Sequence, residues 1–235
     1  MYPAEAEGLE ALRAAANDDV LIPVVMSVDD AHITMERIGT RAGGAFGGDP
    51  AARLGRGLAH IHRSTHAAFG WGADNWIGLL PQRNAWVHGS AAEFFATRRL
   101  MPQVEMAAGR GCLPAGTAAR VERVCARLGE LLPDEPPALL HGDLWGGNWQ
   151  ADDRGRAWLF DPAVAYGSRE QDLAFTSLFG GFPPSFLAAY QEAWPLAPGF
   201  ARRVDLWNLY PLLVHANLFG GGYGRQVDRV ARGFE

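Results

Sequence analysis

Lysine is absent from this sequence, and all 21 basic residues among its 235 are arginine. A Schiff base, a P-loop lysine and the phosphate-orienting lysine of a kinase all need the lysine amino group. These mechanisms are therefore excluded for the 235 residues by themselves.

Cysteines and long apolar runs are also scarce. The two cysteines, Cys112 and Cys125, cannot form the disulfide framework of a small secreted domain, so we expect buried thiols in a reducing cytoplasm. No apolar run approaches the roughly 18 residues of a membrane span, and the acidic N-terminal residues do not look like a signal peptide. The sequence thus predicts a cytoplasmic protein with no membrane partner.

Basic runs are missing as well, since 21 basic residues against 26 acidic ones give a formal net charge of −5. A nucleic-acid partner would require a clustered basic surface, so we expect none. Hydrophobic residues make up 48% of the chain and charged residues 20%, which is typical of a folded globular protein. The length fits one or two domains at roughly 150 residues each, and the oligomeric state is not predicted.

The spacing of apolar residues predicts an α+β organisation. Helices are predicted at residues 4–16, 51–68, 91–108 and 117–132, and over most of the chain from residue 170 onward. Two short apolar segments, 20–26 and 32–38, predict an antiparallel strand pair joined by a turn at Asp29 and Asp30. A strand is predicted at 138–141, with a hairpin between 148 and 160. The glycine-rich residues 39–50 predict a linker, and residues 69–90 an aromatic loop.

The most informative motif is the polar loop LHGDLWGGN at residues 140–148, which is followed by LFDP at 159–162. Its glycines allow the tight turns that would bring Asp143, Asn148 and the later Asp161 together. Two oxygen ligands, Asn148 and Asp161, beside a free carboxylate, Asp143, are what phosphoryl transfer from a magnesium nucleotide requires. The same residue types also suit a loop of Asx turns that holds no metal, and both interpretations stay open.

Together these motifs resemble the fructosamine kinase (ketosamine-3-kinase) family, which is similar in fold to aminoglycoside phosphotransferases and protein kinases. Besides HGDLW-x-GN and DPA, the matching segments are FG at 69–70, PQ-x-N-x-W at 81–86, YG-x-RE-x-DLA at 166–174 and FGGF at 179–182. The resemblance covers nearly the whole chain. It implies a protein-kinase-like two-lobe α+β fold, with a truncated N-lobe in residues 1–40 and a mainly helical C-lobe in residues 41–235.

The resemblance also implies an activity: ATP-dependent phosphorylation of a sugar hydroxyl of a ketosamine, which reverses glycation. Asp143 would be the catalytic base, and His141 would brace its loop. Asn148 and Asp161 would hold Mg²⁺ next to ATP. Trp145 either forms an apolar wall against the substrate or packs in the core.

Further residues are assigned to the nucleotide by the same resemblance. Met35, Glu36 and Arg37 match the hinge between the lobes, where backbone groups meet adenine. Glu5 matches the glutamate that pairs with the ATP-orienting lysine. That lysine and the glycine-containing hairpin that precedes it in the family are missing from this sequence. We therefore expect a slower reaction, because losing one preorganised charged contact to a phosphate costs about 10²–10³ in rate. The missing hairpin is expected to weaken nucleotide binding.

Three explanations of this departure stay open: a start placed too far downstream, a real truncation, or a non-catalytic binding protein. A kinase acting on another small amino-alcohol, such as an aminoglycoside, is a further alternative. Upstream coding sequence and substrate comparisons would separate them.

Other polar residues are predicted to have structural roles. His60, His62 and His66 share one predicted helix with no acidic residue nearby, so packing is favoured over a metal site. Glu170 and Asp172 begin a helix and are expected to hold the catalytic segment through Arg169 or backbone amides. The glycines of residues 220–224 predict a helix-end turn rather than a phosphate cradle, and Asp152–Asp153 a hairpin turn.

Overall fold

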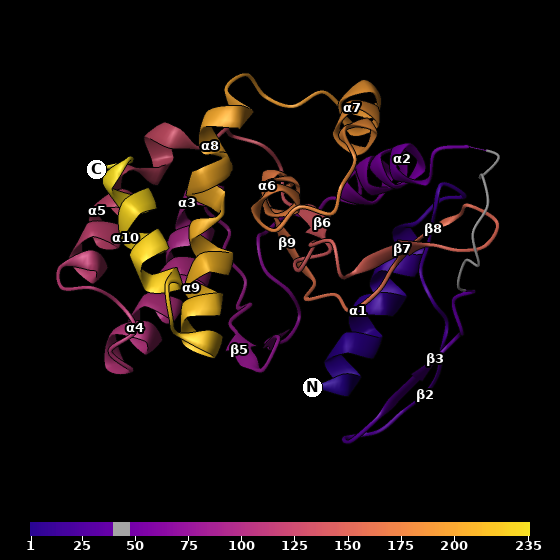
Figure 1. The fold of residues 1–235 in the computed structure, drawn as a ribbon, viewed down its shortest axis with the longest axis horizontal. Coiled ribbons are helices and arrows are strands. Elements are labelled where there is room, and N and C mark those ends of the chain that lie inside the picture. Colours follow the sequence, from indigo (N-terminus) through magenta and orange to yellow (C-terminus); the bar gives the residue numbers. More distant parts are fainter. Residues whose placement is uncertain (40–47) are drawn as a thin grey trace.

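The computed structural model describes residues 1–39 and 48–235, so most of the predicted linker lies outside the described residues (Figure 1). The helices are α1 (Tyr2–Ala15), α2 (Pro50–His62), α3 (Ala91–Phe94), the π-helical segment η1 (Phe95–Leu100), α4 (Met101–Gly109), α5 (Thr117–Leu131), α6 (Glu170–Leu178), α7 (Pro184–Ala193), α8 (Phe200–Trp207), α9 (Leu209–Phe219) and α10 (Tyr223–Arg232). The strands are β1 (Val20–Leu21), β2 (Val25–Val28), β3 (Ile33–Met35), β4 (Asn75–Ile77), β5 (Leu80–Gln82), β6 (Ala138–Leu140), β7 (Trp149–Ala151), β8 (Ala157–Leu159) and β9 (Ala165–Gly167).

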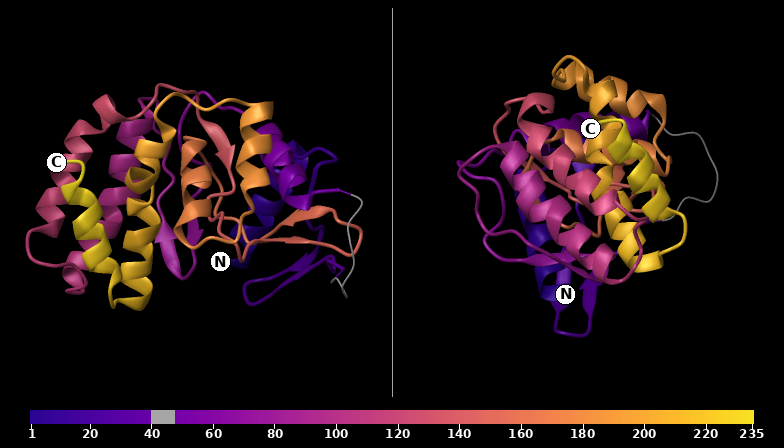
Figure 2. Two further views of the ribbon diagram at one scale, coloured as in Figure 1. Left: turned by 45° about the horizontal axis from the view of Figure 1, so that its top comes forward. Right: turned by 90° about the vertical axis from the view of Figure 1, so that its left-hand side faces the viewer.

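Small sheets accompany the helices. Three are antiparallel pairs, β2–β3, β4–β5 and β6–β9, and the fourth has the order β1-β8-β7 with β1 parallel to β8. Helices α4, α5, α9 and α10 gather at one end of the molecule and β2–β3 lies at the other, with α6, β6 and β9 between them (Figures 1 and 2). The predicted α+β class is therefore confirmed. Among the described residues, no helix combines the length and apolarity needed to cross a bilayer.

Two buried apolar clusters organise the chain. One joins the helices α4, α5 and α8–α10 and includes Trp207, while the other joins α1, α2, α7 and β8 and includes Leu144. Ala163 belongs to the first cluster, although it lies just beyond the strand β8 that helps build the second. The two polar loops of the sequence motif thus lie where the two cores meet.

The N-terminal segment follows the prediction in part. The helix at 4–16 is confirmed as α1, and a carboxylate oxygen of Asp29 accepts the N–H groups of Ala31 and His32 in the predicted turn. The single strand at 20–26 is wrong, because Pro23, which has no N–H to donate, separates β1 from β2. The division into 1–40 and 41–235 stays a prediction, and its boundary lies outside the described residues.

Two predictions for the middle of the chain are also wrong. The helix predicted at 51–68 ends at His62, and the chain then runs beside β6, where the Leu139 N–H donates to the Ser64 carbonyl. The loop predicted at 69–90 contains the hairpin β4–β5, whose turn residue Gly78 has a φ of +56°. The helices at 91–108 and 117–132 are confirmed, the first with a π-helical segment in its middle.

Helices α2 and α7 pack unusually closely. A β-carbon at Gly55 would lie 2.1 Å from the Phe186 carbonyl oxygen, so any larger residue would force the helices apart. Gly129, on an exposed face of α5, has no neighbour within 4 Å of the same position.

These two helical glycines give a matched test. Gly55→Ala is expected to lower the free energy of unfolding by about 1–3 kcal/mol through overpacking. Gly129→Ala is expected to raise it by about 0.5–1 kcal/mol, because alanine has the higher helix propensity. Urea denaturation of both variants measures the difference, and shifts of the same sign would contradict the close approach of α2 and α7.

Candidate active site

The loop between β6 and β7 carries Asp143 and Asn148, and it folds back on itself as the glycines predict. Gly142 has a φ of +82°, which a residue with a β-carbon rarely adopts. The Asn148 side-chain amide donates from Nδ2 to the backbone carbonyl of Asp143 at 2.9 Å and to its carboxylate at 3.1 Å. The catalytic-loop residues predicted from the motif are therefore in direct contact.

Asp161 reaches the same place from the other loop. The Asn148 amide also donates to the Asp161 backbone carbonyl at 3.3 Å, and the Phe160 N–H donates to the Asn148 carbonyl at 3.1 Å. Asp161 is exposed, whereas Asn148 is buried. All three of these contacts use Nδ2 of Asn148, so they leave its Oδ1 available to a cation.

His141 joins the two loops as a neutral ring. Its Nε2 lies 3.0 Å from the Phe160 carbonyl, so Nε2 must carry the proton, and Nδ1 accepts the Asp143 N–H at 3.3 Å. Burial lowers the pKa of His141, although Asp172 and the Phe160 carbonyl act in the opposite direction. The neutral tautomer satisfies both contacts, which is the bracing geometry expected of this residue.

Asp172 holds the catalytic loop through its backbone. Its carboxylate accepts the His141 N–H at 2.7 Å and the Gly142 N–H at 2.9 Å, and it lies 3.2 Å from Nε2 of His62. Burial alone would raise its pKa, but the contacts with His62, His141 and Gly142 hold the pKa below its usual value. The expectation that Asp172 acts through backbone amides is thus met in the structure.

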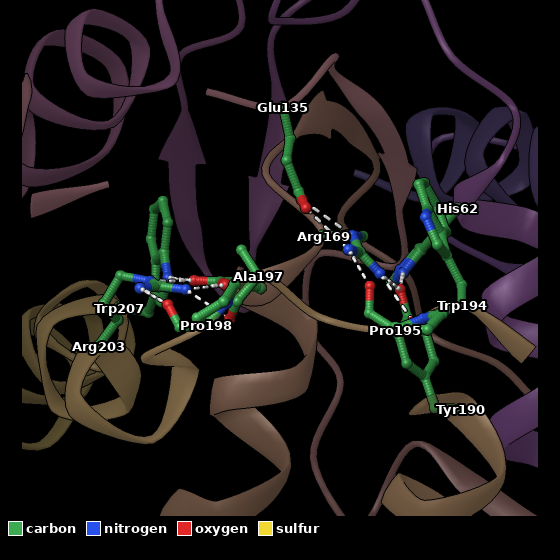
Figure 3. A network of polar contacts seen from close by, with 11 residues as sticks. His62, Glu135, Arg169, Tyr190, Trp194, Pro195, Ala197, Pro198, Arg203 and Trp207 are labelled. Carbon is green, nitrogen blue, oxygen red and sulfur yellow. Dashed lines mark hydrogen bonds and ion pairs between the residues drawn. The ribbon is translucent and has the colours of Figure 1, made fainter. Parts of the chain in front are cut away.

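Two buried ion pairs fix the start of α6, the helix that carries Asp172 (Figure 3). Arg169 donates to Glu135 at 2.7 and 2.8 Å and to the carbonyl of Pro195 at 2.8 Å. Glu170 accepts from Arg203 at 2.6 and 2.8 Å and from Trp207 at 2.9 Å. Glu170 therefore binds two side chains of α8. The sequence-based expectation that it acts through Arg169 or backbone amides is wrong.

The environment of Asp143 favours its neutral form when no cation is present. Burial raises the pKa of Asp143 to about 7, and Asp161 adds to the effect, while the Asn148 hydrogen bond opposes it. Glu5 behaves alike, since burial and then Asp161 raise its pKa. Three carboxylates thus face one region, and bringing them together costs free energy unless a cation binds.

Two cavities meet at Asp143 and Asp161. One of about 190 Å³ lies between the first turn of α1 and the β4–β5 hairpin and is also lined by Glu5 and Trp76. The other, of about 610 Å³, lies between the catalytic loop and α9–α10. Lysine is absent and no arginine is among the described lining residues of either cavity.

The larger cavity has an aromatic wall. Trp145 is 41% exposed, so the core-packing interpretation of this residue is wrong, and it lines the cavity together with Phe179, Phe219 and Tyr223. His215 lies among these rings, 4.7 Å from Phe179 between ring centroids. Its Nδ1 is 2.7 Å from the Pro211 carbonyl, which assigns the proton to Nδ1 and leaves Nε2 as an acceptor.

Little in the sequence marks His215 as a site residue. A single histidine in the apolar run of α9 is typical of a packed residue, and only the tertiary structure shows that it borders the cavity. Burial lowers its pKa, against the effect of the Pro211 carbonyl, so the ring is neutral near pH 7.

The residues fit a magnesium ion of the kind that shares its coordination with phosphates. Mg²⁺ is usually held by one or two protein carboxylates or amide oxygens and keeps its remaining positions for phosphate oxygens and water. The Oδ1 of Asn148 and the exposed carboxylate of Asp161 provide such a sparse donor set. A cage of three or more His, Cys, Asp or Glu ligands is not found in the described part of the chain.

The hinge residues predicted to meet adenine lie apart from these cavities. Met35 ends β3, and the Glu36 N–H donates to the Val24 carbonyl at 2.8 Å, which extends the β2–β3 ladder. Met35, Glu36 and Arg37 are not among the described lining residues of either cavity. Their contact with a nucleotide stays a prediction.

Other candidates have structural contacts. His62 is buried, with Nδ1 at 2.8 Å from the Tyr190 hydroxyl, and the glycines of residues 220–222 connect α9 to α10 as predicted. Cys112 and Cys125 are free and half-buried rather than fully buried. Asp152 is more than a turn residue, because its buried carboxylate binds Nε1 of Trp158 at 3.0 Å and Nε of Arg156 at 2.6 Å.

The raised pKa of Asp143 predicts a pH-dependent stability. In the unfolded chain Asp143 ionises near pH 4, whereas the folded protein resists ionisation up to about pH 7. The metal-free protein should therefore lose stability between these pH values. Asp143→Asn should remove this loss and be more stable above pH 7 by on the order of 1–4 kcal/mol.

Thermal unfolding from pH 4.5 to 8.5 in a chelator measures this difference. Asp153→Asn removes the same charge from an exposed turn and serves as the control. A stability advantage of Asp143→Asn that is absent or does not grow with pH would contradict the assigned environment.

Comparison with known proteins assigns the chain to a family. The model of the fructosamine kinase family matches residues 1–233. A probable ketoamine kinase of Synechocystis sp. is 40% identical over 235 residues, which cover 99% of this chain and 78% of that protein. Mouse ketosamine-3-kinase is 37% identical over 200 residues, which cover 83% of this chain and 61% of the mouse protein.

Solved structures show the same fold. A Thermobifida fusca protein assigned as a fructosamine-3-kinase superposes with a TM-score of 0.89 at 38% identity, covering 98% of this chain and 78% of its own. A Mesorhizobium loti protein of the choline/ethanolamine kinase family, at 19% identity and a TM-score of 0.56, shares the fold alone. The kinase-like fold is therefore confirmed, and this chain belongs to the fructosamine kinase family.

Proposed function

We propose that the protein phosphorylates a sugar hydroxyl of a ketosamine, with ATP as the phosphate donor and Mg²⁺ as the cation. The observation that carries this proposal is the meeting of Asp143, Asn148 and Asp161 from two loops at the junction of two cavities. Family membership supports the reaction class, since named relatives are ketoamine and ketosamine kinases.

The metal site would consist of the Asn148 Oδ1 and the Asp161 carboxylate. Bound there, Mg²⁺ would neutralise phosphate charge and align the terminal phosphate of ATP. The chain contains no lysine, and the site residues include three carboxylates, Glu5, Asp143 and Asp161. A polyanionic nucleotide would be repelled by these groups alone, so its binding to this chain depends on the cation.

Asp143 would orient the attacking hydroxyl and accept its proton. Its carboxylate is held by Asn148 at 3.1 Å, and its backbone N–H is held by His141. A cation beside Asp161 would lower the pKa of Asp143 from about 7, and so provide the ionised form that a base requires. Positioning and charge neutralisation then account for most of the rate enhancement.

The larger cavity would bind the acceptor. The exposed ring of Trp145 offers an apolar wall to a sugar face, and the neutral His215 offers Nε2 as an acceptor for a hydroxyl or ammonium proton. The acidic residues at its base and the aromatic rings around it favour a cationic amine substituent. This chemistry agrees with a ketosamine, in which a sugar is attached to an amine.

The proposed reaction has a consequence for the cell. Phosphorylation would make the ketosamine adduct unstable and so reverse glycation, a repair reaction. We also propose a cytoplasmic location, which the two free thiols and the requirement for ATP support.

Carboxylate substitutions test the reaction. Magnesium-dependent ADP release with fructosyl- and ribulosyl-amines is expected, and Asp143→Asn and Asp161→Asn should each lower kcat at least about 100-fold. Asp153→Asn is the matched control, with unchanged kcat. Turnover of aminoglycosides alone would favour another amino-alcohol kinase, and no ADP release with any acceptor would favour a binding protein.

The acceptor wall has its own test. Trp145→Ala should raise KM for the ketosamine by about two- to tenfold with a smaller change in kcat, because a stacked ring contributes about 0.5–1.5 kcal/mol. Trp86 is similarly exposed but stacks on His66, away from the cavity residues, so Trp86→Ala should leave that KM unchanged. Equal effects of the two substitutions would contradict the assignment of Trp145.

A further inference from the structure

Asp161 has a strained backbone. Its φ of +57° is the only positive value for a residue other than glycine in the described part of the chain. A residue with a β-carbon adopts this left-handed conformation at a cost, and it persists only where neighbouring groups hold the chain. The groups that hold the chain just after Asp161 are therefore candidates for a functional role.

Two buried side-chain amides bind the backbone two and three residues after Asp161. Asn75, on β4, donates from Nδ2 to the Val164 carbonyl at 2.8 Å, and Gln82, on β5, donates from Nε2 to the Ala163 carbonyl at 3.1 Å. Asn75 and Gln82 are paired opposite each other in the hairpin and are 6% and 2% exposed. Ala163 is held from its other side, since its N–H donates to the His141 carbonyl at 2.9 Å.

The orientation of the Asn75 amide is determined by a buried arginine. The Arg99 guanidinium, which can only donate, binds Oδ1 of Asn84 at 2.8 Å, so the Asn84 Nδ2 faces Oδ1 of Asn75, also at 2.8 Å. The Asn75 Nδ2 is then left to face the Val164 carbonyl. Arg99 is 3% exposed and lies over the Phe94 ring, 4.5 Å from its centroid.

The Gln82 amide also has a single orientation. Its Nε2 faces two acceptors, the Ala163 carbonyl and the Asn75 Oδ1, so its Oε1 must accept the hydroxyl proton of Tyr210, at 2.6 Å. Burial raises the pKa of Tyr210, which keeps this donor protonated. Every amide in the network thus has one orientation that satisfies its neighbours.

We propose that Asn75 and Gln82 form an amide clamp that positions Asp161 for metal binding. The clamp fixes the carbonyls of Ala163 and Val164, two and three residues after Asp161, and the contact between Asn148 and the Asp161 carbonyl fixes the residue itself. The inference rests on the proposed function, because it takes Asp161 as a ligand of the cation. Asn75 and Gln82 are positioning residues, since neither contacts the carboxylate of Asp161.

The clamp is tested first without metal or substrate. Gln82→Met removes the amide at similar volume, whereas Tyr210→Phe removes a hydrogen bond to the same amide but leaves its contact with Ala163. Amide hydrogen exchange, followed by mass spectrometry in a chelator, reports on residues 160–166. We expect exchange there to be about tenfold faster in Gln82→Met and within about twofold of the parent in Tyr210→Phe.

Kinetics provide the second measurement. Gln82→Met should raise the Mg²⁺ concentration needed for half-maximal activity by about tenfold, while KM for the ketosamine changes less than twofold. Tyr210→Phe should keep both values close to those of the parent. If Gln82→Met does not fold, Gln82→Glu at pH 8 replaces it, because the ionised carboxylate cannot donate to Ala163.

The outcomes separate the clamp from the proposed function. Unchanged exchange and Mg²⁺ dependence in the Gln82 variants, or equal effects of Tyr210→Phe, would overturn the clamp while the parent stays active. A parent protein without magnesium-dependent phosphorylation would overturn the function, and the exchange result would still decide whether Gln82 holds this loop.

Discussion

Two carboxylates that repel each other, Asp143 and Asp161, are held close together, and the proposed cation site depends on this arrangement. Their repulsion is visible in the pKa of Asp143, which burial raises to about 7 with a further contribution from Asp161. Nothing within the pair favours this arrangement. The amide of Asn148 contacts both loops, and the rest of the structure keeps the loops where that amide can reach them.

That support comes from both halves of the molecule. Leu144, in the loop between β6 and β7, belongs to one apolar cluster, and Ala163, in the loop after β8 that carries Asp161, belongs to the other. The geometry of the site therefore depends on how the two clusters are placed relative to each other. Asp172 binds the catalytic loop through backbone N–H groups, and the ion pairs of Arg169 and Glu170 orient the helix that carries it. Buried ion pairs add little net stability, but they accept few alternative geometries.

Much of this site could be predicted because its chemistry is local in the sequence. The run from His141 to Asn148 carries the proposed base, a proposed metal ligand and the glycines that fold them together. Prediction was wrong where distant contacts override local preference. The segment after His62 leaves the helix to pair beside β6, and β1 separates from β2 to join β8. The hairpin β4–β5 escaped prediction because its three-residue strands lie among the glycines and the proline that interrupt residues 69–90.

By itself, the sequence determined which chemical groups are available: two aspartate carboxylates and an amide in neighbouring polar loops, and no lysine. These are properties of side chains and of short spacings, so they need no coordinates. Only the tertiary structure decided the pKa of Asp143, the position of His215 on the cavity wall and the hydrogen bonds of Asn75 and Gln82 to the loop that carries Asp161. The hydrogen bonds of Asn75 and Gln82 to that loop and to Tyr210 join residues that are 81 to 128 positions apart in the chain, and no local sequence pattern encodes contacts over such separations.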